Sequence, residues 1–293
     1  MLKQRIITAL LLLPLVGVIL FSLNLKFFAT ALLIINYLMA WEWARLSGLS
    51  HPVQRSFYSL FIGLLALGIW FFSFDLFFWP APTWSLEFSP DATVLAIWSG
   101  VVIWALAILM VLTYPKTNGV WNKGPWVRLL LGTVILIAFW VSMISIRNTD
   151  YLLDPIRGSW FLLLMFGIIW AADVGAYAAG KTLGKHKLAP SVSPGKTWEG
   201  ALGGAVASII VALVGAQLLE VSVDDWLLFS LAIVGIVAIS VFGDLFESAL
   251  KREQSMKDSS QLLPGHGGLL DRMDSTLAVA PFFLILTKSL GWN

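Results

Sequence analysis

The residues in this chain with the clearest capacity for chemistry are acidic and stand near the ends of apolar segments. Asp244 and Glu247 are three positions apart, and Asp271 and Asp274 repeat that spacing. Residues three apart share one face of a helix. Carboxylates grouped in this way raise one another's pKa unless a cation lies between them. Because oxygen ligands without a histidine or cysteine cluster suit hard cations, the pattern favours Mg²⁺ or a similar ion.

An alternative is that these acids mark two helix ends, with Asp271 as an N-cap, since acids are common at helix starts. Asp173 is less easily explained because it stands inside an apolar run. An ionised carboxylate there costs about 2.5–3.5 kcal/mol at full membrane depth and needs a partner or a water-filled cavity. We therefore expect Asp173 either to belong to a site or to form a hydrogen bond between helices.

Basic residues surround the paired acids. They are Lys251, Arg252 and Lys257 after the first pair, and Lys185, Lys187 and Lys196 in the preceding polar loop. A basic loop by itself reflects membrane topology and attraction to lipid headgroups. Carboxylates that hold a metal, placed beside cations that neutralise phosphate, are also the parts needed for phosphoryl or nucleotidyl transfer. The combination predicts chemistry on a phosphate.

The stretch LPGHGGLLDRMDS, residues 263–275, places glycines on both sides of His266. Glycine permits positive φ and close approach of the backbone to a ligand. Backbone amides that precede a helix also suit a phosphate. Because a phosphate nucleophile is already ionised at neutral pH, His266 is expected to serve binding or loop order.

Three further patterns carry weaker chemical meaning. The run GAYAAGKT, residues 175–182, matches a phosphate-loop expression, but an apolar helix leads into it where that loop requires a strand. Gly200 and Gly204 have the spacing that lets a neighbouring membrane helix approach closely. Glu42, between two tryptophans, is expected to be a polar contact between helices.

The elements that must position these residues are membrane helices. The chain is 58% hydrophobic and 12% charged, with a mean hydropathy of +0.84. A helix needs about 20 apolar residues to cross a bilayer. We expect an all-α, polytopic membrane protein with about nine transmembrane helices, at roughly 6–23, 27–43, 57–79, 93–113, 129–146, 158–178, 200–219, 227–247 and 276–291.

The distribution of basic residues predicts the orientation of the chain. The charged start, followed by apolar residues 6–23 without a small-residue cleavage site, indicates a retained first helix. With a cytoplasmic N-terminus, all of the 19 basic residues except Lys26, Arg147, Arg157 and Lys288 fall in inside loops. This bias agrees with the positive-inside rule and places residues 263–275 in the cytoplasm.

The run from Ser248 to Asp274, called here the signature segment, closely resembles the signature of the phosphatidate cytidylyltransferases, or CDP-diacylglycerol synthases. Its matching positions are Ser248, Lys251, Arg252, Lys257, Asp258, Ser260, Leu263, Pro264, His266, Gly267, Gly268, Asp271, Arg272 and Asp274. WAADVGAYAAG (170–180) and SPGKTWEG (193–200) are also similar to that family. We therefore divide the chain into N-terminal transmembrane helices, 1–150, and a C-terminal catalytic region, 151–293, with its active site on the cytoplasmic side.

The resemblance implies a Mg²⁺-dependent reaction of CTP with phosphatidate in a bacterial inner membrane. The expected metal ligands, for Mg²⁺ alone or with a second cation, are Asp244, Asp271 and Asp274. The expected catalytic residues are Lys251, Arg252, Lys257, Asp258, His266 and Arg272. The expected substrate-binding residues are Asp173, Ser193, Lys196, Thr197, Gly267 and Gly268. The resemblance and the glycine-spaced helix faces also suggest a homodimer.

Two other functions are compatible with acids at a membrane. CDP-alcohol phosphotransferases also use aspartates and a metal, but their characteristic run starts with Asp-Gly, a pair that is absent from this sequence. A transporter or channel would place its acids near the membrane midplane, on broken helices in related halves of the chain. In this chain the acids cluster near the cytoplasmic ends of the predicted helices, which favours the enzyme.

Overall fold

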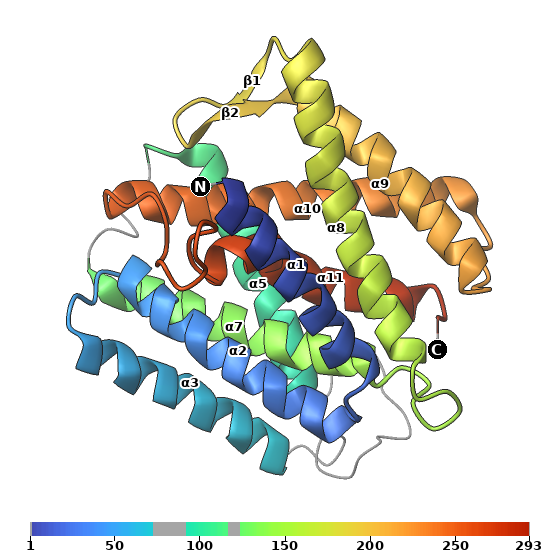
Figure 1. Cartoon of the computed structure of the whole chain (residues 1–293), viewed down its shortest axis with the longest axis horizontal. Coiled ribbons are helices and arrows are strands. Elements are labelled where there is room, and N and C mark those ends of the chain that lie inside the picture. Colours follow the sequence, from blue (N-terminus) through green and yellow to red (C-terminus); the bar gives the residue numbers. More distant parts are fainter. Residues whose placement is uncertain (1, 73–91, 117–123, 293) are drawn as a thin grey trace.

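The computed structural model describes residues 2–72, 92–116 and 124–292, which form a bundle of long helices (Figure 1). The helices are α1 (Leu2–Phe21), α2 (Leu25–Leu46), α3 (Pro52–Phe72), α5 (Ala92–Thr113), α7 (Pro125–Arg147), α8 (Arg157–Leu183), α9 (Trp198–Leu218), α10 (Trp226–Glu253) and α11 (Leu270–Ser289). Two short strands, β1 (Lys187–Ala189) and β2 (Ser193–Thr197), form an antiparallel hairpin between α8 and α9.

Seven helices of the described chain are long and apolar enough to cross a membrane, namely α2, α3, α5, α7, α8, α9 and α10. The described parts of all nine predicted segments lie on helices, apart from one or two residues at some ends, and residues 73–79 of the third segment lie outside the described residues. The two outside these seven are α1, whose described apolar part is only Leu10–Phe21, and α11, which begins with three charged residues in its first five. The expected all-α, multi-pass membrane protein is confirmed.

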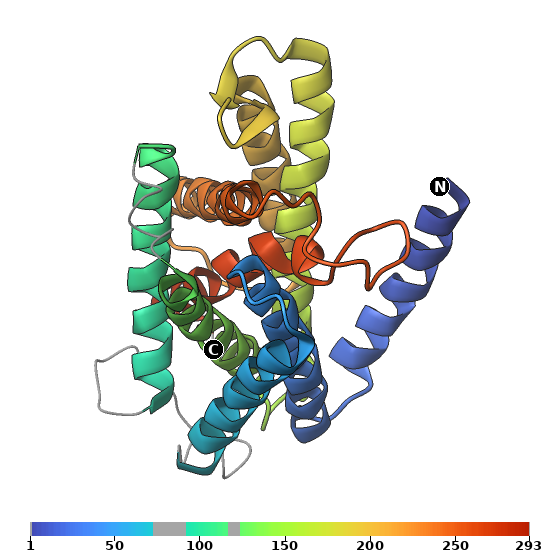
Figure 2. The same ribbon diagram turned by 90° about the vertical axis from the view of Figure 1, so that its left-hand side faces the viewer.

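The core of the bundle is built around α7 and α11. α7 is the most buried of the seven candidate spans, and its Phe139 and Trp140 are fully enclosed. α11 packs against α7, α10 and α5, so its polar first turn is brought inside the bundle. α1 lies at the edge of the molecule, as Figure 2 shows.

The last helices extend further than the sequence suggested, and this changes the setting of the acids. α8 continues to Leu183, so Asp173 is well inside a helix and the GAYAAGKT run is helical throughout. The run is therefore no phosphate loop, as expected. α10 continues to Glu253, which places Asp244 and Glu247 two or three turns before its end. The hairpin was not expected, because two strands of three and five residues leave little pattern in the sequence.

Helices α8 and α9 are in backbone contact through small residues. A Cβ built on Gly204 would lie 2.6 Å from the Ala172 carbonyl oxygen, and one on Gly200 would lie 2.9 Å from that of Ala176. The expected packing role of this glycine pair is confirmed. Close contact between these helices also fixes the hairpin that joins them.

The described contacts cross the division drawn at residue 150. α11, from the second part of the sequence, packs against α7 and α2, and α10 packs against α5. The division therefore describes the sequence motifs and does not separate two packing units. The N-terminal helices form one wall of the region that holds the signature segment.

Replacing Gly204 by alanine is expected to destabilise the protein, because the new methyl group would overlap the Ala172 carbonyl. Overpacking of this kind costs about 1–3 kcal/mol. Gly63→Ala, in α3, is the matched control, since a Cβ there meets no atom within 4 Å. Thermal unfolding of both variants in detergent measures the difference. Equal midpoints for the two variants would contradict close packing of α8 on α9.

Candidate active site

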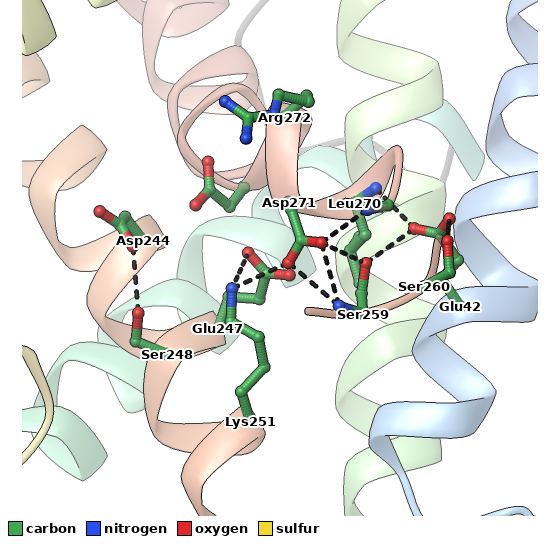
Figure 3. A network of polar contacts seen from close by, with 12 residues as sticks. Glu42, Asp244, Glu247, Ser248, Lys251, Ser259, Ser260, Leu270, Asp271 and Arg272 are labelled. Atoms are coloured by element: carbon green, nitrogen blue, oxygen red, sulfur yellow. Dashed lines mark hydrogen bonds and ion pairs between the residues drawn. The ribbon is translucent and has the colours of Figure 1, made fainter. Parts of the chain in front are cut away.

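The predicted site residues converge where α8, α9, α10 and α11 meet the hairpin and the α10–α11 loop, residues 254–269. Figure 3 shows part of this region. Asp271 lies between Lys251, on α10, and Ser259, in the loop. Glu42, on α2, lies on the far side of Ser259.

A cavity of about 360 Å³ lies between α8, α9, α10 and β2. Most of its lining is apolar, but charged side chains stand in its wall, and it is called here the polar cavity. Asp173, Lys196 and Thr197 line it. The ammonium Nζ of Lys196 is 2.7 Å from Oδ2 of Asp244, and Asp173 is near enough to both to interact electrostatically. The structure thus brings together three residues that the sequence predicted from three separate motifs.

An apolar cavity of about 410 Å³ adjoins the polar one. The two share four lining residues, Leu188, Ala201, Val237 and Val241. The rest of the apolar cavity is formed mainly by aliphatic and aromatic side chains of α5, α9, α10 and the hairpin. A molecule with a charged head and an apolar tail would find both environments at one place.

Asp271 is the most heavily hydrogen-bonded acid of the predicted set. Its Oδ1 accepts from Lys251 Nζ at 2.9 Å, and its Oδ2 accepts from Gly268 N at 2.7 Å and from Ser259 Oγ at 3.0 Å. The Ser259 backbone N–H also donates to this carboxylate. Burial alone would raise the pKa of Asp271, but the hydrogen bonds from Lys251 and Gly268 outweigh it, and the pKa lies below its usual value. In this structure, Asp271 therefore holds the α10–α11 loop in place through these hydrogen bonds.

Glu247 is almost completely enclosed and poorly satisfied. Its side chain is 4% exposed, neither oxygen accepts a hydrogen bond, and Lys251 Nζ is 3.5 Å away. Asp274 lies close enough to Asp244 to feel its negative charge, and close enough to Glu247 for the two side chains to interact. Burying several carboxylates beside one another is costly, so this acidic group favours the presence of a further cation.

The donor set suits Mg²⁺ in kind, because each candidate ligand is a carboxylate oxygen. The unsatisfied oxygens of Glu247 support a cation at this place. As the side chains stand, however, no three acidic or histidine groups of the described chain are arranged as a metal site. A bound ion would have to draw Asp244 and Asp274 toward it, and Asp271 would first have to exchange its present donors. The three predicted ligands stay a prediction.

The remaining predicted catalytic residues lie on the exposed side of this region. Arg252, Lys257, Asp258 and Arg272 are exposed. Arg272 donates from Nε and Nη2 to the His266 carbonyl oxygen, at 3.1 and 2.7 Å, and so closes the turn that holds the histidine. The His266 ring is half-buried, and its Nδ1 has no hydrogen-bond partner. Their assignment to catalysis stays a prediction.

The predicted substrate-binding residues divide into two kinds. Thr197 is the N-cap of α9, and its hydroxyl accepts from Gly200 N at 3.1 Å, so it already has a structural task. Ser193 is at the start of β2. Gly267 and Gly268 precede α11, and Gly267 has a φ of +89°, which favours glycine. Binding by these residues stays a prediction as well.

Two residues of this region were missed from the sequence. Glu42 was expected to be a contact between helices, but its carboxylate accepts four hydrogen bonds from the α10–α11 loop and the first residue of α11. Ser259, within the signature segment, donates from its hydroxyl to Glu42 and from its backbone N–H to Asp271. The available signal was an acid inside an otherwise apolar helix, which indicates a buried partner but not which one.

Lys251 is expected to stabilise the fold, whereas Lys257 is not. Replacing Lys251 by methionine leaves Glu247 and Asp271 without their shared cation, and breaking a buried pair costs about 3–5 kcal/mol. Lys257→Met, at an exposed position in the same segment, should change stability by less than about 0.5 kcal/mol. Denaturation of both variants in detergent measures the contrast. Similar stabilities would show that Lys251 is not the structural cation.

Comparison with known proteins agrees with this geometry. The model of the cytidylyltransferase family matches residues 3–290. The chain is 39% identical to the phosphatidate cytidylyltransferase of Haemophilus influenzae over 289 residues, 97% of each protein. It is also 39% identical to that of Pseudomonas aeruginosa over 293 residues, 100% of this chain and 99% of the relative. With the phosphatidate cytidylyltransferase of Staphylococcus saprophyticus it shares 36% identity over 207 residues, 63% of this chain and 78% of the relative. The protein therefore belongs to the cytidylyltransferase family.

Proposed function

We propose that the region around Lys196, Asp244 and Asp271 transfers the cytidylyl group of CTP to phosphatidate. The products are CDP-diacylglycerol and pyrophosphate, and the protein is a membrane-embedded nucleotidyltransferase of phospholipid biosynthesis. The observation that carries the proposal is that the polar cavity, with Lys196 in its wall, adjoins a more apolar cavity. This pairing suits a lipid whose phosphate must meet charged groups while its acyl chains stay out of water.

In this reaction a phosphate oxygen of phosphatidate forms a bond to the α-phosphorus of CTP. The bond from that phosphorus to the β-phosphate oxygen breaks, and pyrophosphate leaves with the electron pair. Because the attacking oxygen is ionised at neutral pH, no side chain has to remove a proton. The tasks left to the chain are to hold two anionic substrates in line and to neutralise their charge.

The cations of the region are assigned to the phosphates. Lys196 reaches the polar cavity, so it is placed to contact a phosphate there. Five basic residues are assigned to the triphosphate of CTP and the phosphate of the lipid, namely Lys196, Lys251, Arg252, Lys257 and Arg272. Asp258 and His266 would order the exposed turn, and Asp173 would contact a ligand from the cavity wall. Ser193, Thr197, Gly267 and Gly268 would line the entrance.

Mg²⁺ would be held by Asp244 and Asp274, and by Asp271 once that residue has exchanged its donors. When bound, the ion supplies further neutralisation of the nucleotide phosphates. The proximity of Asp244 and Asp274 and the unsatisfied Glu247 support this assignment. A second cation beside Glu247 would complete the charge balance.

The purified chain in detergent is expected to convert labelled CTP and phosphatidate into a lipid-soluble cytidine product in the presence of Mg²⁺. A chelator should stop the reaction, and restoring Mg²⁺ should restart it, because the triphosphate and the acids would otherwise repel. The measurement is the label in the organic phase together with released pyrophosphate. Binding of CTP without any product would contradict the enzyme and favour a transport or binding site.

The variant Asp244→Asn tests the same site. It preserves the size of the side chain while removing the charge that pairs with Lys196, so turnover should be lost from a protein that still folds. Asp224→Asn is the matched control, since Asp224 is exposed in the connection before α10, far from the cavity. Turnover retained in Asp244→Asn would remove this residue from the metal and phosphate site.

The active site is proposed to face the cytoplasm from a bacterial inner membrane. The chain contains no cysteine, so a single introduced cysteine reports on one position. Gln261→Cys, in the α10–α11 loop, should react with an impermeant maleimide in inverted vesicles only, and Asp224→Cys, at the other end of α10, in spheroplasts only. The reverse pattern would place the site outside. The homodimer suggested by the resemblance stays a prediction.

A further inference from the structure

Glu42 is a buried acid that the proposed chemistry does not use. It lies on α2, and only 1% of it is exposed. No direct contact joins it to the polar cavity, since none of the residues lining that cavity belongs to α2. Each hydrogen bond of its carboxylate instead goes to the α10–α11 loop or to the first residue of α11, more than 200 residues later in the chain.

The four hydrogen bonds join the two arms of the α10–α11 loop. Oε1 accepts from Ser260 Oγ at 2.5 Å and from Leu269 N at 3.0 Å. Oε2 accepts from Ser259 Oγ at 3.0 Å and from Leu270 N at 2.7 Å. Each oxygen thus binds one hydroxyl before the His266 turn and one backbone amide after it. The carboxylate closes the loop at its base.

The two backbone amides, those of Leu269 and Leu270, lie at the start of α11. The first N–H groups of a helix have no partner within the helix, and a negative charge there is favourable. The side chain of Leu269, at the N-cap position, cannot supply an acceptor. Glu42 therefore does from α2 what a capping side chain would do, and this fixes where α11 begins.

Glu42 is connected to the predicted site by one residue. The hydroxyl of Ser259 lies 3.0 Å from Oε2 of Glu42 and 3.0 Å from Oδ2 of Asp271. Asp271 in turn is held by Lys251 at 2.9 Å. A shift of the loop at Glu42 would thus move Asp271 and the pairing of Lys251.

The surroundings leave little freedom for another arrangement. A Cβ on Gly268 would come within 2.0 Å of Ser259 Oγ and 2.6 Å of Glu42 Oε2, so the loop has closed tightly around the carboxylate. Arg45, one turn further along α2, donates from Nη1 to the Ser259 carbonyl at 3.0 Å. Two residues of the same helix face hold the same loop residue.

We propose that Glu42 is a positioning residue for cytidylyl transfer, which sets the place of Asp271 and of the Gly267–Gly268 amides by capping α11 from α2. The inference rests on the proposed function for its catalytic part. Stability alone does not explain a carboxylate at this position, because proteins in which apolar residues replace buried charged groups are often equally stable. What the carboxylate adds is a fixed position for donors on both arms of the loop.

The test compares kcat and the KM for CTP of Glu42→Gln, Ser260→Ala and the double variant with those of the original chain. Glutamine keeps the shape but turns an N–H₂ group toward two donors. Because small displacements of reacting groups can cost 100-fold, we expect Glu42→Gln to lower kcat by about 100-fold, with a smaller change in KM. Since Ser260 acts through Glu42, adding Ser260→Ala should lower kcat no further. Effects that multiply would overturn the inference.

Trp43→Phe is the matched control for mere loss of stability. Trp43 is the next residue of α2, is buried, and donates from Nε1 to the Arg128 carbonyl on α7 at 2.8 Å, a bond that does not include Ser259, Ser260 or the start of α11. This variant should lower the unfolding temperature while leaving kcat unchanged. If Glu42→Gln lowered kcat only as far as Trp43→Phe does at an equal loss of stability, Glu42 would be a structural residue only.

Trypsin cleavage after Lys257, identified by mass spectrometry, reports on the loop without using activity. Cleavage at this exposed site requires local opening, so it should be faster in Glu42→Gln and in the milder Ser260→Ala, but not in Trp43→Phe. If cleavage were unchanged in both Glu42→Gln and Ser260→Ala, the inference that Glu42 positions the loop would be overturned. If the original chain made no CDP-diacylglycerol, the proposed function would fail, while the cleavage comparison would still decide whether Glu42 holds the loop.

Discussion

Carboxylates inside an apolar bundle are costly unless donors reach their oxygens, and this cost shapes the loop of the signature segment. Glu42 and Asp271 satisfy it with the same short piece of chain, since each accepts from Ser259 and from amides beside the start of α11. An unpaired buried charge would cost far more than any single contact returns. The loop has one arrangement in which all these donors are reached, so its shape follows from the two acids.

Small residues make that arrangement possible, both in the loop and between the helices. Gly268 allows Ser259 and Glu42 to approach, and Gly203 and Gly204 allow α9 to touch the backbone of α8. In a membrane, helices associate by close packing, so such contacts carry much of the fold. The glycine pair of the signature segment therefore has a packing reason, which is independent of any role in binding a phosphate.

The sequence predicted the helices well, because apolar runs of spanning length leave a strong signal in composition. It also predicted that Asp173, Lys196 and Asp244 belong to one region, since acids are rare within membrane helices and Lys196 stood in a basic loop at the same membrane surface. It could not show that Lys196 pairs with Asp244, or that Thr197 caps α9, because both depend on how the hairpin folds back. The link from Glu42 to Leu270 spans 228 residues, and no local pattern encodes a contact of that separation.

The pairs inside the region also bear on how charged substrates could enter it. Lys196 is paired with Asp244, and Lys251 with Asp271 and Glu247, so both lysines already have acidic partners before any ligand arrives. A phosphate that reaches Lys196 has to compete with Asp244, and a cation that reaches Asp244 has to compete with Lys196. When both arrive together, the phosphate pairs with Lys196 and the cation with Asp244, so each removes the competitor of the other. Arrival of the nucleotide with its cation is therefore favoured over arrival of either one alone.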